Sequence, residues 1–370
     1  MMKKKVNIVT FHDAQNYGAM LQAYALQNIL EKEYDVEIID YKNEVIQKQN
    51  KIFSINKKNL KTIIRSLIHI VLYGYKKYIR SYRFKKFSKE NLHLTRVYRT
   101  EKELKQNYPK SYAYIAGSDQ IWNTEITGKL SDIYTLNFGD ESIKKISYAA
   151  SIGNSKISND EQEEYKEKIS KLDAISIREE DGKKILESFI SKDISVVLDP
   201  TLLLTKEEWN EKLVGRKDKI KEKYILAYVV EPDDEYIKIV NYLSEKTKLK
   251  IVHFAHRNGR IKNVVSNAYS KDPFEFINLI KNAEYVVCTS FHATVFSIIF
   301  NKKFFVVPHR KTGSRVTNLL NRIKIDNRIV YDLNEFKSID YDFLTDWDTI
   351  EKNLAKEREK SIIWLKDSLK

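Results

Sequence analysis

The chain has 370 residues, which is long enough for two domains, and it carries a net charge of +14. A hydrophobic content of 42% with 12% aromatic residues is typical of a globular protein and excludes a disordered one. The single cysteine, Cys288, excludes an internal disulfide, and no apolar run reaches the roughly 18 residues that a membrane span needs.

The chain begins with the pattern of a strand–helix–strand unit. Its three elements are predicted at Lys4–Thr10, about Met20–Glu33 and Val36–Asp40. The apolar part of the first strand is too short for a signal peptide, so we expect a cytoplasmic protein. The loop before the helix lacks the GxGxxG fingerprint, which argues against a dinucleotide site of that kind. Asn16, Tyr17 and Gly18 in this loop are candidates for lining a cleft; the alternative is that Asn16 only caps the helix.

A strongly basic stretch follows. Between Val45 and Lys89 there are 13 Lys or Arg residues and no Asp or Glu. Apolar residues in Leu60–Leu72 recur at helical spacing, so we predict a basic helical insertion over about residues 45–107. Peripheral contact with the inner membrane surface and a simple solvated helix are both open interpretations. No nucleic-acid partner is expected, because no zinc spacing, RNA-binding signature or helix-turn-helix accompanies the charge.

Four further strands complete the first half, and polar residues follow two of them. The strands are predicted at Tyr112–Ala116, Lys145–Ala149, Ala174–Ile177 and Ser195–Leu198. After the first come Gly117, Ser118, Asp119 and Gln120, which are suited to a tight turn, to capping or to binding hydroxyl groups. After the third comes Arg178, whose guanidinium can hold a carboxylate or phosphate with two hydrogen bonds. The alternative for Arg178 is an ion pair with Glu179 or Glu180.

A new alternating series begins after residue 200, where we place the domain boundary. Its strands are predicted at Tyr224–Val230, Lys250–Phe254, Tyr285–Cys288 and Phe304–Pro308. The sequence therefore predicts an α/β protein with two Rossmann-like domains facing a cleft, at residues 1–200 and 201–346. A last helix over residues 347–370 is a candidate for packing back on the first domain.

The turn Thr289–His292 lies between a buried strand and an apolar helix. Open α/β sheets bind ligands at such places, and free N–H groups at a helix start attract anions. His292 is therefore a candidate functional imidazole next to an anion site, with helix capping as the alternative. Arg315, in the basic loop that follows Pro308, is a candidate anion ligand, although solvated loop charges are common.

Several short motifs occur in a fixed order along the chain. They are Asn16-Tyr17-Gly18, Gly117-Ser118-Asp119-Gln120-Ile121-Trp122, Ser147-Tyr148-Ala149-Ala150-Ser151, Ser176-Ile177-Arg178-Glu179, Leu198-Asp199-Pro200 and Thr289-Ser290-Phe291-His292. Together they resemble the polysaccharide pyruvyl transferase family over roughly Val6 to Arg328.

The resemblance implies a GT-B-like fold and transfer of pyruvate from phosphoenolpyruvate to a sugar of a cell-surface polysaccharide or its lipid-linked precursor. The product is a ketal, and neither a metal nor a cofactor is required. His292 is implied as the acid/base and Arg178 as the anion clamp. Substrate-binding positions are then expected at Ser290, Phe291, Asn16, Tyr17, Gly18, Gly117, Ser118, Asp119, Gln120 and Arg315.

One departure from the family pattern concerns the donor site. Better-described members carry Arg-Leu immediately before this histidine, and that arginine holds the donor; here the residues are Ser290 and Phe291. Arg310 or Arg315 would have to supply the charge. Two other functions are therefore kept open: a GT-B-type glycosyltransferase with a nucleotide-sugar donor, and a non-catalytic subunit of a surface-glycan pathway.

Overall fold

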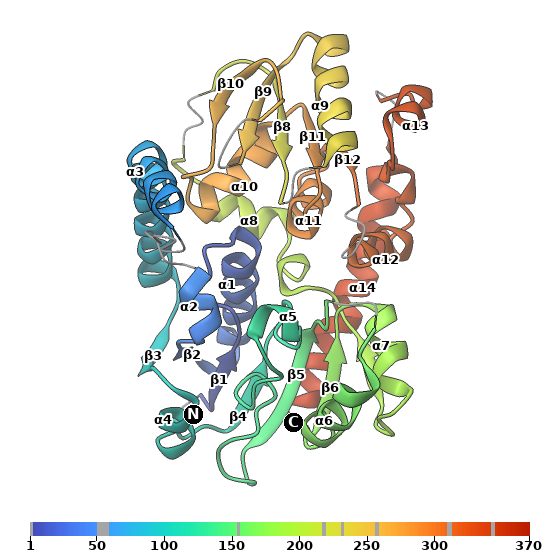
Figure 1. Cartoon of the computed structure of the whole chain (residues 1–370). Coiled ribbons are helices and arrows are strands. Elements are labelled where there is room, and N and C mark those ends of the chain that lie inside the picture. Colours follow the sequence, from blue (N-terminus) through green and yellow to red (C-terminus); the bar gives the residue numbers. More distant parts are fainter. Residues whose placement is uncertain are drawn as a thin grey trace.

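Figure 1 shows the computed structural model, which describes residues 3–49, 59–153, 156–216, 220–230, 233–255, 259–308, 313–341 and 345–370. Helix α3 (Leu60–Asn91) is described with its side chains from residue 74 onward. In the part of the chain described, no helix combines the length and the apolar character needed to cross a lipid bilayer.

The amino-terminal half is built on a seven-stranded sheet in which every neighbouring pair of strands is parallel. The strands are β1 (Lys5–Val9), β2 (Asp35–Tyr41), β3 (Leu94–Tyr98), β4 (Ala113–Ala116), β5 (Lys144–Ala150), β6 (Ala174–Ile177) and β7 (Ile194–Val196). Their order is β3-β2-β1-β4-β5-β6-β7, so the direction of winding reverses between β1 and β4. Ligands of open α/β sheets bind at such a reversal. The loops after β1 and β4 are therefore well placed for a site.

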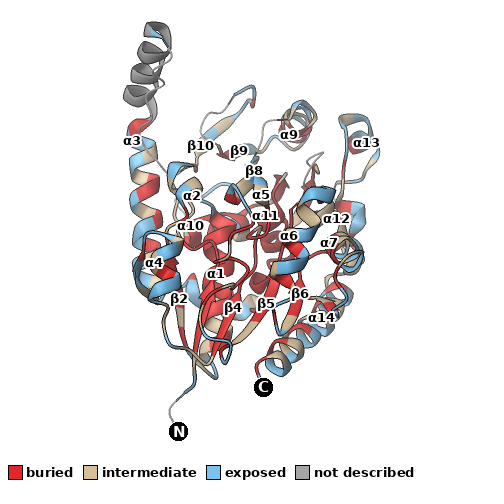
Figure 2. Cartoon of the chain, turned by 60° about the horizontal axis from the view of Figure 1, so that its bottom comes forward, coloured by how far each residue is buried: buried red, intermediate tan, exposed pale blue. Residues whose placement is uncertain are grey.

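Helices cover this sheet. They are α1 (Tyr17–Glu31), α2 (Glu44–Gln49), α3, α4 (Glu101–Gln106), α5 (Thr124–Thr127), α6 (Asn159–Ile169) and α7 (Glu180–Glu187). Helix α1 is buried nearly all round, because it packs on β2 on one side and on elements of the second half, α10 and α11, on the other. Figure 2 shows α1 as a mainly red, buried element. The start of α1 therefore faces the junction of the two halves.

The carboxyl-terminal half has a five-stranded parallel sheet in the order β10-β9-β8-β11-β12. Its strands are β8 (Tyr224–Tyr228), β9 (Lys250–Phe254), β10 (Val264–Asn267), β11 (Tyr285–Cys288) and β12 (Lys303–Val306). Its helices are α8 (Lys206–Lys212), α9 (Asp234–Thr247), α10 (Pro273–Asn282), α11 (Phe291–Ile299), α12 (Ser314–Arg322), α13 (Leu333–Ser338) and α14 (Trp347–Ser368), with short 3-10 helices η1 (Pro200–Leu202) and η2 (Asp326–Arg328). In this second sheet, the direction of winding reverses between β8 and β11.

The prediction of a helical insertion over residues 45–107 is wrong in its last part. Residues 94–98 form strand β3, which pairs with β2 at the edge of the first sheet; the amide of Lys42, for example, donates to the Tyr98 carbonyl at 2.9 Å. An edge strand buries little, and only one of the five residues of β3 is buried, so its sequence lacks the apolar run that marks a central strand. The second edge strand, β10, was missed for the same reason.

The two halves share one continuous apolar core that contains buried residues of both sheets and of α14. Helix α14 runs back against the first half (Figure 1), where the Leu198 amide donates to Ser361 Oγ at 3.0 Å. Tyr112, at the start of β4, donates its hydroxyl to the carbonyl of Leu369 at 2.8 Å. Helix α3 lies along one flank beside both halves. The halves are therefore held together by two helices as well as by the core.

Candidate active site

Asp199 lies at the centre of a buried polar cluster at the junction of the halves. It follows β7, and its Oδ1 accepts hydrogen bonds from the amide and the hydroxyl of Thr201 at 3.0 and 2.6 Å. Its Oδ2 accepts from Ser118 Oγ at 3.0 Å and from Arg178 Nη1 at 2.9 Å. Burial by itself would raise the pKa of Asp199, but His292, Arg178 and Thr201 outweigh it and hold this pKa well below its usual range. Asp199 is therefore a carboxylate at neutral pH.

His292 reaches this carboxylate from the other half. It is the second residue of α11, and its Nε2 lies 3.5 Å from Asp199 Oδ2. The opposite side of the ring lies against Gly18 in the first turn of α1, where an added Cβ would come within 1.9 Å of Nδ1. Only glycine leaves room for the imidazole at this position. Nε2 of the ring therefore faces the Asp199 carboxylate, and Nδ1 faces the backbone of Gly18.

Arg178 is enclosed by carboxylates. Besides Asp199, its guanidinium lies 3.9 Å from Asp119 Oδ1 and 3.7 Å from Glu179 Oε2. Burial would lower the pKa of Arg178, but these three acids raise it above its ordinary value. The guanidinium also lies 4.4 Å above the Phe291 ring. Because the charge of Arg178 is already compensated, its main contact is an internal ion pair, formed with Asp199 and not with Glu180.

Arg315, at the start of α12, faces the same cluster. Burial, followed by repulsion from Arg178, lowers the pKa of Arg315 to about 10, so the side chain stays charged at neutral pH. No carboxylate of the described residues lies within ion-pair distance of it. Arg178, Asp199, Phe291 and Arg315 line a hollow of about 20 Å³, which has room for roughly one water molecule. Arg315 is thus the better available anion ligand, and Arg310 lies outside the described residues.

The residues around His292 divide between capping and lining the hollow. Ser290 caps α11, with its Oγ 3.5 Å from the amide of Ala293. Asn16 caps α1 by accepting from the amides of Gly18 and Ala19, at 2.9 and 3.2 Å. Phe291 packs its ring edge-to-face with the ring of His292, at a centroid distance of 5.2 Å. Asn16 therefore caps α1, as the alternative prediction held. It also lines a second pocket.

The four residues after β4 have different surroundings. Gly117 packs on Thr10, where an added Cβ would come within 3.0 Å of the Thr10 Cβ. Ser118 bonds Asp199, and Asp119, with a positive φ of 77°, turns its carboxylate toward Arg178. Gln120 instead accepts a hydrogen bond from the side-chain amide of Asn123 at 2.9 Å. Ser118 and Asp119 therefore belong to the cluster, whereas Gly117 and Gln120 shape the turn.

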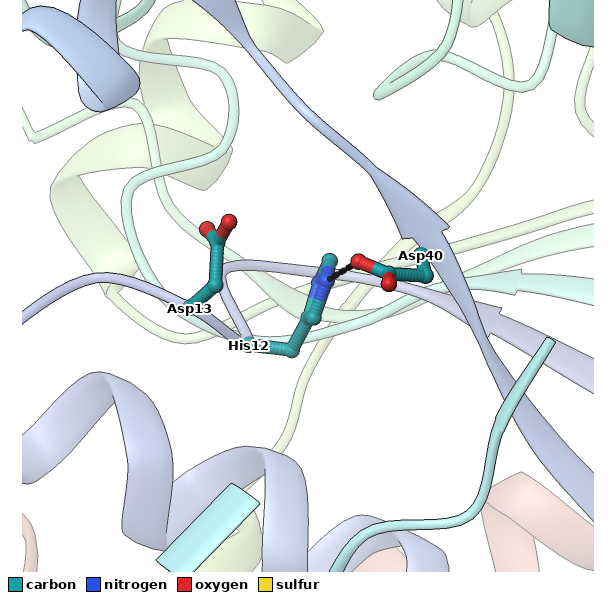
Figure 3. Close-up of side chains that lie close together, drawn as sticks. All are labelled: His12, Asp13 and Asp40. Carbon is teal, nitrogen blue, oxygen red and sulfur yellow. Dashed lines mark hydrogen bonds and ion pairs between the residues drawn. The ribbon is translucent and has the colours of Figure 1, made fainter. Parts of the chain in front are cut away.

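A second polar cluster lies in the loop after β1, where no metal-ligand group was expected. Figure 3 shows His12, Asp13 and Asp40, whose potential ligand atoms all lie within 4.8 Å of one another. His12 Nε2 lies 2.8 Å from Asp40 Oδ1, and its Nδ1 lies 3.1 Å from the Thr10 carbonyl oxygen. Lys42 Nζ pairs with Asp13 at 3.0 Å and with Asp40 at 2.5 Å. The ammonium group of Lys42 bridges the two acids, so the cluster is an internal ion network that holds this loop.

The family of the chain follows from a comparison that includes these residues. The family model for polysaccharide pyruvyl transferase matches residues 16–311. The chain belongs to this family. The resemblance found in the sequence motifs is thereby confirmed, whereas no curated protein matches the chain.

One solved structure supports the fold of this pyruvyl transferase family member, and two others match it less closely. A UDP-N-acetylglucosamine 2-epimerase matches with a TM-score of 0.51 and 11% identity, covering 98% of this chain and 95% of that chain. The same enzyme from Rickettsia bellii matches with a TM-score of 0.49 and 12% identity, covering 99% and 98%. A glycotransferase of kitacinnamycin matches with a TM-score of 0.45 and 8% identity, covering both chains fully. The predicted GT-B-like α/β fold is confirmed.

Two residues of this family member were not among the predicted site residues. Asp199 occurs in one of the quoted motifs, but nothing in the sequence shows that Ser118, Arg178 and His292 converge on it. Arg80 of α3 is buried, but it lies in a stretch so rich in basic residues that no single one is distinguished by the sequence.

Proposed function

We propose that the protein transfers pyruvate from phosphoenolpyruvate to a sugar of a cell-surface glycan or its lipid-linked precursor, as a ketal. The observation that carries this proposal is His292, fixed between Asp199 and Gly18 where the halves meet, beside a hollow lined by arginines. Membership of the family supports the reaction class. The proposal extends the family assignment to the donor and to the residues that act on it.

In this mechanism His292 moves protons and Asp199 positions its ring. The imidazolium donates a proton to C3 of phosphoenolpyruvate, which makes C2 electrophilic. A first sugar hydroxyl adds to C2, and its proton leaves with the phosphate as the C2–O bond to phosphate breaks. A second hydroxyl then adds to C2 and returns a proton to His292, which closes the ketal. The carboxylate of Asp199, 3.5 Å from Nε2, holds the ring in position for the first step.

The donor's negative charges require a cation and space. Arg315 and the amides at the start of α11 supply favourable charge next to His292. The present hollow of about 20 Å³ admits roughly one water molecule, so phosphoenolpyruvate needs a wider opening. One wall, with Arg178 and Asp199, belongs to the first half, and the other, with Phe291 and Arg315, to the second. Donor binding is therefore expected to separate these walls, and closure to exclude water.

The first experiment is a thermal-shift titration with phosphoenolpyruvate, run in parallel with nucleoside diphosphates. A ligand that binds only the folded protein raises the unfolding temperature as its concentration passes the dissociation constant. We expect a saturable rise with phosphoenolpyruvate that is weakened in Arg315→Gln and kept in His292→Ala. With a glycan acceptor, His292→Ala should release no phosphate, and wild-type product should gain the mass of pyruvate less one water. A rise with nucleoside diphosphates alone would point to glycosyl transfer and contradict the proposal.

The proposal includes peripheral membrane contact through α3. On its outer face Tyr75, Tyr78 and Tyr82 are 75%, 56% and 58% exposed. Exposed lysines, including Lys76 and Lys85, alternate with these rings. Tyrosine rings suit the interface between lipid and water, and lysines attract anionic headgroups. This face would hold the enzyme at the cytoplasmic membrane surface, where a lipid-linked acceptor is found.

A further inference from the structure

A second, larger pocket is lined by Asn16 and Tyr17, the two residues before Gly18. Its volume is about 590 Å³, and it opens between the loop after β1, helix α3 and the carboxyl ends of β8 and β9. Both halves contribute side chains, most of them apolar or aromatic. The aromatic lining consists of Tyr17, Tyr228, Phe254 and Tyr269. A pocket of this size and composition is suited to a small organic ligand with a ring.

Arg80 places a buried positive charge in this pocket. Only 7% of the residue is exposed, and its guanidinium lies 4.5 Å from the ring centroid of Tyr17 and 4.7 Å from that of Tyr269. Its hydrogen bonds go to neutral acceptors: the Tyr17 hydroxyl at 2.6 Å, the Tyr269 carbonyl at 2.5 Å and the Gln15 carbonyl at 2.8 Å.

Within the described chain, Arg80 has no carboxylate partner. This distinguishes it from Arg83, one turn further along α3, which pairs with Glu275 at 2.8 Å. Burying a charge without a counter-charge is costly, and a bound anion removes that cost. The pocket therefore combines aromatic walls with a cation that lacks a negative partner, which fits a ligand with both a ring and an anionic group.

We propose that this pocket binds the acceptor as a glycosyl phosphate, with the phosphate on Arg80 and the sugar ring against Tyr228 and Tyr269. The inference rests on the proposed function, because it assigns the acceptor of that reaction to this pocket. Tyr17 lines the pocket, and the next residue, Gly18, touches the imidazole. The donor's cation, Arg315, lies in the other hollow. His292 thus follows Phe291, which lines the hollow, and touches Gly18, which follows a residue of the larger pocket.

The test is isothermal titration calorimetry on the full chain, with hexose 1-phosphates, the matching free hexoses and phosphoenolpyruvate as probes. We expect hexose 1-phosphates to bind at least tenfold more tightly than free hexoses, because a charged hydrogen bond has roughly that effect on affinity. Arg80→Gln should remove this difference and leave phosphoenolpyruvate binding unchanged. Arg83→Gln is the matched control: it removes a contact between α3 and the second half but no pocket charge, and should retain the difference.

A second variant tests the same pocket independently, in case Arg80→Gln does not fold. Ala255 lines the pocket, and Ala255→Trp fills it without altering Arg80. This variant should lose hexose 1-phosphate binding and keep phosphoenolpyruvate binding. A prenyl diphosphate hexose and a nucleoside diphosphate hexose, compared on wild-type protein, distinguish a lipid carrier from a nucleotide as the source of the glycosyl phosphate.

The outcomes separate this inference from the proposed function. Equal hexose 1-phosphate affinity in wild type and Arg80→Gln overturns the inference, as does loss of phosphoenolpyruvate binding in Arg80→Gln, which would make the pocket the donor site. Both results leave pyruvyl transfer itself standing. Failure of wild-type protein to consume phosphoenolpyruvate, in contrast, contradicts the proposed function.

Discussion

The imidazole of His292 lies so close to the Cα of Gly18 that an added Cβ would come within 1.9 Å of Nδ1. The two residues are 274 positions apart in the sequence (292 − 18 = 274) and belong to different halves of the molecule. Their contact fixes the ring in line with Asp199, and it also couples the position of the ring to the packing of the two halves.

Gly18→Ala should therefore displace the imidazole. Overpacking of this kind costs about 1–3 kcal/mol of unfolding free energy, and we expect turnover to fall by roughly a hundredfold because a displaced proton donor is misaligned. Urea unfolding and phosphate-release kinetics measure the two effects. In a His292→Ala background the stability cost should largely vanish, since the clashing ring is gone. An equal cost in both backgrounds would show that the clash is not with His292.

Asp199→Asn should destabilise the fold by about 3–5 kcal/mol, because it leaves the buried Arg178 without its closest counter-charge. It should also lower turnover, since the imidazolium of His292 loses its anionic partner. Asp119→Asn is the comparison, as its carboxylate lies 3.9 Å from Arg178 and makes no contact with His292. Urea unfolding should show a smaller effect for Asp119→Asn. Equal effects of the two substitutions would contradict the central role of Asp199.

The lowered pKa of Asp199 predicts how stability depends on pH. An acid whose folded pKa lies below its unfolded value of about 3.9 contributes stability above that value and loses it as pH falls toward the folded pKa. Wild-type protein should therefore lose unfolding free energy between about pH 5 and pH 3. Asp199→Asn, measured by urea unfolding at the same pH values, should lose less over this range. A steeper loss in the variant than in the wild type would be inconsistent with this assignment.

The exposed tyrosines of α3 predict binding to anionic vesicles. The triple substitution of Tyr75, Tyr78 and Tyr82 by Ser should reduce co-sedimentation with phosphatidylglycerol vesicles and leave the unfolding temperature unchanged, because these rings are largely exposed. Wild-type binding should weaken with added salt. Tyr331→Ser, at a ring 61% exposed on the second half, is the control and should bind as wild type. Undiminished binding by the triple variant would exclude this face as the contact.

Much of the fold was predictable because buried parallel strands are short apolar runs followed by polar turns. The strands Ala174–Ile177, Lys250–Phe254 and Tyr285–Cys288 were predicted with the bounds that the structure shows. The edge strands β3 and β10 were missed, since a strand with one neighbour and few buried side chains has no such run. In the site, the sequence identified His292, Ser118 and Arg178 as polar residues at strand ends. It did not identify Asp199 as the residue that all three contact.

The sequence by itself determined the two-part α/β architecture, the family and the position of His292 at a helix start, because these depend on local periodicity and on ordered motifs. Only the tertiary structure decided which charges meet. It paired Arg178 with Asp199, left Arg315 and Arg80 without carboxylate partners among the described residues, and set His292 against Gly18. Such pairings depend on how the halves pack across long stretches of chain. Electrostatic energy depends on distance in space, which residue spacing along the chain does not specify.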